Sequence, residues 1–188
     1  MPSQRVSKEY NSATYFLTLT VQHWYYIFDR HNRFQILADS LTYCQKNKQL
    51  KIYAYVFMLN HLHLIISSPD VIGFIRDFKK FTSKEIQKSI AAFEPNVLKL
   101  FEDSEGGYDF WQPSNMPKLI ESEDFLQRKT EYIHHNPMRK QYVKNPEDWV
   151  WSSANPDSQI KIDLILDGFR KPRGIEGRFG FAIRIIYF

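Results

Sequence analysis

The chain of 188 residues is long enough for one domain with a substantial core, and its 30 aromatic residues (4 Trp, 11 Tyr and 15 Phe) exclude disordered and collagen-like chains. Its net charge of +4 is only a weak pointer to phosphate-rich partners. No apolar run approaches the ~18 residues of a membrane helix, no signal-peptide pattern opens the chain, and the single Cys44 favours a reducing cytoplasm because it cannot form an internal disulfide.

A strand and a helix are predicted first. Residues 14–22 are rich in β-branched and aromatic side chains, which predicts a strand. One side of that strand carries every second residue, namely Tyr15, Leu17, Leu19 and Val21. Residues 32–48 repeat apolar side chains at intervals of three and four, which predicts a helix. Its apolar face consists of Phe34, Leu37, Ala38, Leu41 and Cys44.

A hairpin and a long helix follow in the chain. Residues 51–58 and 61–67 predict two strands, and the short connection at Leu59 and Asn60 makes them antiparallel. A helix is then predicted over about 70–92. Its expected buried stripe consists of Ile72, Ile75, Phe78, Phe81, Ile86 and Ile90.

The last predicted elements are a loop and one more helix. Residues 101–118 contain two Gly and two Pro, which predicts a loop with room for one short strand. A helix is expected to begin near Ser122, a capping residue followed by two acids, and to end at Asn136, because Pro137 disfavours helical geometry in the residue before it. The order of elements predicts an α+β fold, with helices packed on one side of a mainly antiparallel sheet.

The C-terminal part of the chain is assigned separately. We expect a single domain over residues 1–155 and an extension over 156–188. Residues 175–178 read Ile-Glu-Gly-Arg, the recognition tetrapeptide of a protease often engineered into expression vectors. The segment from about residue 171 is therefore interpreted as vector-derived and is left out of the fold prediction. The alternative is a native last strand with alternating apolar residues.

Two histidines on the second hairpin strand form the first candidate site. His61 and His63 are two residues apart, so both imidazoles point to one face of the strand while Leu62 and Leu64 point to the other. Imidazoles at this spacing can bind one divalent metal ion. The alternatives are two surface histidines, or one hydrogen-bonded core histidine beside a solvated one.

The last predicted helix carries the second candidate site. Tyr132 and Asn136 are four residues apart and therefore neighbours on one helix face. A phenol and an amide beside the histidine pair would place a nucleophile next to a metal. The alternative is a core tyrosine with an asparagine that ends the helix. His134 and His135 are interpreted as helix-end residues, which the helix dipole favours.

At these motifs the chain resembles a known family. Residues 55–65 (YVFMLNHLHLI) resemble the signature of the HUH single-strand DNA transposases, in which U is a hydrophobic residue. Within them the chain resembles the REP-associated tyrosine transposases over about residues 14–155. The other segments that carry this resemblance are 76–83 (RDFKKFTS), 110–112 (FWQ), 131–137 (EYIHHNP) and 151–153 (WSS). Leu59 departs from the family, in which a Pro commonly precedes the Asn.

The resemblance implies a fold, a reaction and a metal. The fold would be the ferredoxin-like HUH endonuclease architecture. Tyr132 would attack single-stranded DNA at palindromic repeat hairpins, which leaves a 5′-phosphotyrosine link and a free 3′-OH that allows rejoining. Asn136 would join His61 and His63 as the third protein ligand of a divalent cation. Two nitrogens, an amide oxygen and open positions suit Mg²⁺ or Mn²⁺ better than a closed Zn²⁺ site.

Further residues are candidates for contacts with DNA. Basic residues at helical spacing could contact phosphates: Arg76, Lys79, Lys80 and Lys84. A solvated helix face is the alternative. Trp111 and Gln112 could stack on and read an unpaired base, or Trp111 could be a core anchor.

Two other functional classes remain open at this point. One is a DNA-binding relative without catalysis, which the intact Tyr132, His61, His63 and Asn136 argue against. The other is a metal-dependent phosphoesterase that uses water and is indifferent to Tyr132→Phe. The expected partner is single-stranded DNA or a DNA hairpin, with no membrane. The chain could act as a monomer or a homodimer, and a cytoplasmic, nucleoid-associated location is expected.

Overall fold

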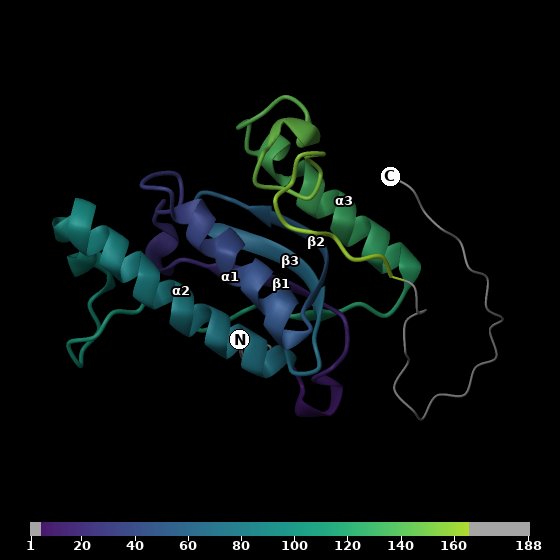
Figure 1. Cartoon of the computed structure of the whole chain (residues 1–188), viewed down its shortest axis with the longest axis horizontal. Helices are drawn as coiled ribbons and strands as arrows, with labels where there is room; N and C mark the ends of the chain where they lie inside the picture. Colours follow the sequence, from purple (N-terminus) through teal and green to yellow (C-terminus); the bar gives the residue numbers. More distant parts are fainter. Residues whose placement is uncertain (1–4, 166–188) are drawn as a thin grey trace.

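One antiparallel sheet lies at the centre of the computed structural model, which describes residues 5–165 (Figure 1). The strands are β1 (Tyr15–Thr20), β2 (Lys51–Phe57), β3 (His61–Ser67) and β4 (Lys118–Leu119). They lie in the order β2-β3-β1-β4, and each neighbouring pair is antiparallel. The three longer strands and the hairpin between β2 and β3 confirm the sequence prediction.

Three α-helices complete the α+β fold, which is the predicted fold class. They are α1 (Arg33–Lys48), α2 (Val71–Phe93) and α3 (Glu123–Arg139). Side chains cap two of them as their sequences suggest, because Asp70 accepts a hydrogen bond from the Gly73 amide and Ser122 accepts one from the Phe125 amide. The short 3₁₀ helices are η1 (Lys8–Tyr10), η2 (Gln22–Trp24), η3 (Pro95–Phe101) and η4 (Pro146–Asp148).

The sheet has one face that is almost wholly apolar. Leu17 and Leu19 of β1 and Leu62 and Leu64 of β3 are fully buried in the larger core cluster. The apolar sides of α1 and α2 cover this face, and the two helices pack against each other (Figure 1). Every second residue of each strand therefore supplies the main core, as the alternation in the sequence predicts.

The opposite face of the same strands is covered by α3. A smaller cluster there contains Phe16 of β1, Val56 of β2, Ile65 of β3 and Ile133 of α3. The expectation that all helices pack on one side of the sheet is thus wrong. Apolar residues on both sides of β1 leave two faces to be covered, and all six residues of that strand are buried.

Two details of the helices differ from the prediction. Ile72 and Phe81, placed in the buried stripe of α2, are exposed. Beside Phe81 it is Thr82 that takes the inward position, where it donates a hydrogen bond to the Phe78 carbonyl. Helix α3 continues past Pro137 to Arg139. A proline removes only one backbone donor, and the burial of Ile133 and Pro137 under the sheet offsets that loss.

The outer edge of β2 is covered by the segment that follows α3. The Phe57 amide donates to the Trp151 carbonyl, and the Asp163 amide donates to the Ile52 carbonyl. The described part of the predicted extension, residues 156–165, thus packs on the sheet, with Ile160 buried. The segment from about residue 171 lies outside the described residues. Among residues 5–165, none of the helices is both long and apolar enough to cross a membrane.

Candidate functional site

The two predicted histidines lie side by side on the α3 face of the sheet. His61 and His63 of β3 have ring centroids 4.9 Å apart, with their planes at 76°. The register of β1 against β3 places Thr20 opposite His61 and Thr18 opposite His63. The alternation of β3 therefore puts the imidazoles on the face opposite Leu62 and Leu64, as predicted.

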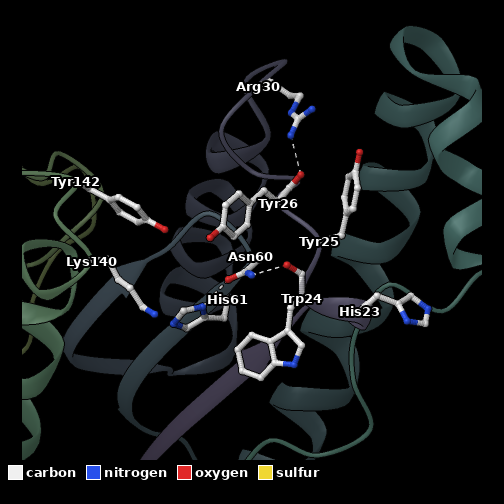
Figure 2. A pocket seen from close by; sticks show the side chains of 9 residues that line it. All are labelled: His23, Trp24, Tyr25, Tyr26, Arg30, Asn60, His61, Lys140 and Tyr142. Atoms are coloured by element: carbon white, nitrogen blue, oxygen red, sulfur yellow. Dashed lines mark hydrogen bonds between the residues drawn. The ribbon is translucent and has the colours of Figure 1, made fainter.

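A hydrogen bond to Asn60 determines which nitrogen of His61 is available. The Asn60 amide Nδ2 donates to the Trp24 carbonyl at 2.6 Å, so the amide oxygen faces Nδ1 of His61 at 2.7 Å (Figure 2). Because an amide oxygen only accepts, Nδ1 of neutral His61 carries the proton. The lone pair of His61 is then on Nε2, where a ligand can use it.

His63 is held in a similar way from the neighbouring strand. Its Nδ1 lies 2.8 Å from the Thr18 hydroxyl, and its ring stacks on Phe16 with centroids 5.4 Å apart. Its Nε2 is buried and has no hydrogen-bond partner within residues 5–165. A buried polar atom without a hydrogen-bond partner lowers the stability of the fold unless a ligand bonds to it, so this nitrogen points to a binding function.

Burial keeps both imidazoles neutral. It lowers the pKa of His61 to about 4, with a further contribution from the charge of Lys140. Burial is also the main reason that the pKa of His63 is lowered to about 3, and the charges of the nearby His61 and Lys129 lower it further. Neutral imidazole is the form that binds a metal, so the pair can act as ligands without first losing protons.

Helix α3 brings the other two predicted residues to the same face. The Tyr132 ring packs edge-on against His63 with centroids 5.1 Å apart, and against Phe16 at 6.0 Å. Asn136 lies one turn further along α3 and is only 5% exposed. The structure therefore places the predicted nucleophile directly beside the histidine pair.

The donor set fits a divalent cation with one or more open positions. Within residues 5–165, no group of three or more His, Cys, Asp and Glu side chains could hold a metal ion. A third protein ligand beside His61 and His63 would thus be a neutral oxygen, and Asn136 is the predicted one. The hydrogen bond that His61 Nδ1 donates to the Asn60 amide oxygen, and the one between His63 Nδ1 and the Thr18 hydroxyl, are the usual support for histidine ligands.

The Tyr132 ring is bordered by two cations that the sequence did not lead us to predict. Lys129 Nζ lies 5.4 Å from the centre of that ring and 4.6 Å from that of Phe16, and Arg139 Cζ lies 5.5 Å from the Tyr132 ring. These three α3 residues line one pocket of about 350 Å³. The spacing of 129, 132, 136 and 139 places all four positions on one helix face, so the sequence contained a signal for them.

The predicted basic residues of α2 do not join this site. Helix α2 covers the opposite face of the sheet from α3. Arg76 is paired with Asp77 at 2.9 Å, and the Lys79 ammonium donates to the Gln112 carbonyl at 2.7 Å. Burial lowers the pKa of Lys79 to about 8. Lys80 and Lys84 are exposed on the surface of α2.

Trp111 is a core residue in this fold. Trp111 is buried, packs against Phe28 and donates from its indole nitrogen to the Thr82 hydroxyl at 3.0 Å. Its ring is enclosed and cannot stack on a base, so the core alternative holds and the stacking prediction is corrected. Gln112 extends the sheet edge, because its backbone amide donates to the Thr20 carbonyl at 2.8 Å.

Comparisons with known proteins agree on one kind of protein. The family model described as transposase IS200 like matches residues 9–136. The REP-associated tyrosine transposase of Escherichia coli K12 is 23% identical over 142 residues, which cover 71% of this chain and 77% of that protein. A Haemophilus influenzae Rd protein proposed to be of the same kind is 26% identical over 116 residues, covering 58% and 61%.

A solved structure shares the fold. The structure of a REP-associated tyrosine transposase bound to a REP hairpin superimposes with a TM-score of 0.61 at 18% identity. The match covers 90% of this chain and 98% of that one. The sheet with helices on both faces is therefore the fold of that protein as well.

Proposed function

This chain belongs to the IS200-like transposase family, and from that premise we propose that it cuts and rejoins single-stranded DNA through a covalent bond to Tyr132. One observation carries the proposal. The Tyr132 ring packs against His63, whose Nε2 is buried without a partner, and is bordered by Lys129 and Arg139. A nucleophile, an unfilled ligand position and two cations for a phosphate thus meet at one point.

The chemical step follows from these groups. The Tyr132 hydroxyl attacks the scissile phosphorus, so that an Oη–P bond forms and the P–O3′ bond breaks. The phenol proton leaves to solvent, and the departing 3′ oxygen takes up a proton to become a 3′-OH. Lys129 and Arg139 attract the phosphate to the ring and balance charge that develops on its oxygens. Attack by a 3′-OH on the tyrosyl ester reverses the step and rejoins strands without an external energy source.

A divalent cation, Mg²⁺ or Mn²⁺, is part of the proposal. The Nε2 atoms of His61 and His63 and the amide oxygen of Asn136 would hold it. When bound there, such a cation would polarise a phosphate oxygen and orient the phosphate for in-line attack. The Asn60 oxygen keeps His61 in the ligating tautomer, and the Thr18 hydroxyl orients the His63 ring.

The proposed substrate is a DNA hairpin with a single-stranded flank. The solved relative with this fold is bound to a REP hairpin, which supports the same class of DNA here.

A covalent-adduct assay tests the role of Tyr132. Wild type and Tyr132→Phe are mixed with labelled single-stranded DNA that carries a palindromic repeat, with Mn²⁺ or EDTA, and separated on a denaturing gel. We expect a metal-dependent shifted band that Tyr132→Phe lowers by at least roughly 10³-fold, because the variant keeps the ring and loses only the nucleophile. Cleavage that persists in Tyr132→Phe would instead favour a water-using nuclease.

A second assay tests the metal ligands. Mn²⁺ binding is measured by calorimetry for wild type, His63→Ala and a matched control, His135→Ala, whose ring bonds only to the Glu131 carbonyl of its own helix turn. We expect His63→Ala to abolish binding and His135→Ala to preserve it. Equal binding by all three proteins would contradict the proposed ligand set.

A further inference from the structure

A second and larger pocket, of about 590 Å³, opens at His61 and is not lined by Tyr132. Its volume is in the range of small-molecule and nucleotide sites. It is built from three segments that are distant in the chain: residues 23–30, Asn60 with His61, and residues 140–142. Of the candidate catalytic, metal-binding and DNA-binding residues predicted from the sequence, His61 alone is among those lining this pocket.

One wall of the pocket presents aromatic rings to solvent. Trp24 is 58% exposed and Tyr26 is 49% exposed, although large aromatic side chains are usually buried. The indole ring lies edge-on to His61 with centroids 6.1 Å apart. Figure 2 shows both aromatic side chains around the space in front of His61.

The backbone that carries this wall is strained and is held in place. His23 and Trp24 have φ angles of 56° and 57°, in the left-handed region that favours glycine. The Asn60 amide donates to the Trp24 carbonyl, and Arg30 donates to the Tyr26 carbonyl at 2.8 Å. Strain of this kind persists where the surrounding structure fixes it, and such positions cluster at functional sites. Asn60 thereby links the aromatic wall to His61.

The opposite side of the pocket is polar and cationic. Lys140, the residue that follows α3, points toward His61 (Figure 2) and contributes to the lowered pKa of that histidine. Tyr142 faces Tyr26 across the pocket, and burial together with their hydrogen bond raises the pKa of Tyr142 to about 12. Arg30 is already paired with Asp29 and Glu94, so Lys140 is the cation that remains for a phosphate.

We propose that this pocket binds one unpaired nucleotide of the DNA strand next to the scissile phosphate. Its base stacks on Trp24, and its phosphate lies near Lys140. The inference rests on the proposed function, because His61 is both a wall of the pocket and a ligand of the reacting centre. Exposed rings with a nearby cation are the chemistry that binds single-stranded nucleic acid, and every base offers a flat face to stack.

The experiment combines protein and DNA variants. A labelled DNA hairpin with single-stranded flanks is prepared in versions that each lack one flanking base, and equilibrium binding is measured by fluorescence anisotropy. Trp24→Ala is compared with Tyr43→Ala, which removes a ring of matched exposure, 59%, from α1. Trp24→Phe serves as the rescue variant because it restores a flat ring.

We expect one abasic position to weaken binding by wild type and by Tyr43→Ala by roughly 5- to 150-fold. Trp24→Ala should bind the intact strand more weakly than wild type by a similar factor. Removing the base at that position should then weaken its binding no further. Trp24→Phe should recover most of the lost affinity. An unchanged abasic penalty in Trp24→Ala, or wild-type affinity of that variant, would overturn the proposal.

The result is separable from the outcome for Tyr132. Binding does not need the nucleophile, so Tyr132→Phe should keep the full abasic penalty. A Trp24-dependent penalty without any covalent adduct in wild type would uphold the pocket and reject the tyrosine chemistry. An adduct in wild type together with an abasic penalty that does not depend on Trp24 would uphold the tyrosine chemistry and reject the pocket. Failure of wild type to bind the hairpin would reject both proposals.

Discussion

The two faces of the sheet are built from the same strands and differ in nearly every respect. On the α1 and α2 face, Leu17, Leu62 and Leu64 are fully buried among apolar side chains. On the α3 face the same strands place Thr18 and His63, which are buried and hydrogen-bonded to each other. The first face therefore contributes the larger share of apolar burial, and the second positions polar groups beside its smaller apolar cluster, at a cost in desolvation.

This difference shows how a short strand serves two purposes. Residue alternation sends one side chain to the core and the next to the site, so neighbours in sequence have unrelated roles. The rigid apolar face fixes the backbone of β1 and β3. The register between these strands then fixes the distances between the polar groups on the other face. Substitutions one residue apart should consequently separate stability from chemistry.

The largest effect is expected on the apolar face. Leu64→Ala should lower the free energy of unfolding by about 2–5 kcal/mol, because it removes fully buried methyl groups and leaves a cavity. Urea denaturation followed by circular dichroism measures the change. Adduct formation per folded molecule should stay close to wild type. A loss below about 1 kcal/mol would mean that this face tolerates voids and that the contrast between faces is overstated.

A neighbouring position on the polar face should behave in the opposite way. Thr18→Val keeps the shape of the side chain and removes the hydroxyl that bonds to His63 Nδ1. We expect Mn²⁺ binding to weaken by about 10- to 100-fold, the usual cost of losing the partner behind a histidine ligand. Calorimetry measures the affinity, and Thr18→Ser, which retains the hydroxyl, is the control. Wild-type affinity in Thr18→Val would show that the hydroxyl does not support the ligand.

The pH dependence of stability sharpens the comparison further. The folded pKa values of His61 and His63, about 4 and about 3, lie below the ordinary value of 6.5. Between these limits the unfolded chain binds protons that the folded chain does not. Stability is thus full above pH 6.5 and falls as the pH drops toward 4. The slope is at most about 1.4 kcal/mol per pH unit for each histidine.

Denaturation of the metal-free protein in EDTA between pH 7 and 4.5 measures this slope. The lowered carboxyl pKa values of Asp77 and Glu94 affect stability mainly toward the acid end of this window, and burial also lowers the pKa of His134. The contribution of the histidine pair is therefore read from the comparison with a variant. His63→Gln should flatten the profile in part, because His61 and His134 still gain protons on unfolding in this window. A flat wild-type profile would show that the pair is solvated rather than buried.

The smallest effect is expected from the cations around the nucleophile. Arg139→Gln should slow adduct formation by about 2- to 5-fold, the size of an exposed cation–ring contact, and the difference should shrink as salt is added. Gel quantification of the adduct at two salt concentrations measures it. Lys46→Gln, an exposed charge on α1, is the control. A loss as large as that of Tyr132→Phe would show that the reaction depends on Arg139 far more than on an exposed charge near the phosphate.

Local patterns in the sequence predicted most of the elements and the main residues of the candidate site. The alternation in residues 61–67 placed His61 and His63 together, and the helical spacing placed Tyr132 beside Asn136. These rules depend only on the period of a strand or a helix, which neighbouring residues determine among themselves. The same rules misplaced Phe81 and the end of α3, where burial against distant segments outweighed local preference.

The tertiary structure alone decided which groups meet. Thr18 and His63 are 45 residues apart, and their contact depends on the pairing of β1 with β3. The enclosure of Trp111, the position of α3 across the sheet from α2 and the meeting of Trp24 with Lys140 around His61 depend likewise on distant packing. Periodicity states which way a side chain faces, whereas the partner it finds there is set by strand register and by the burial of both faces at once.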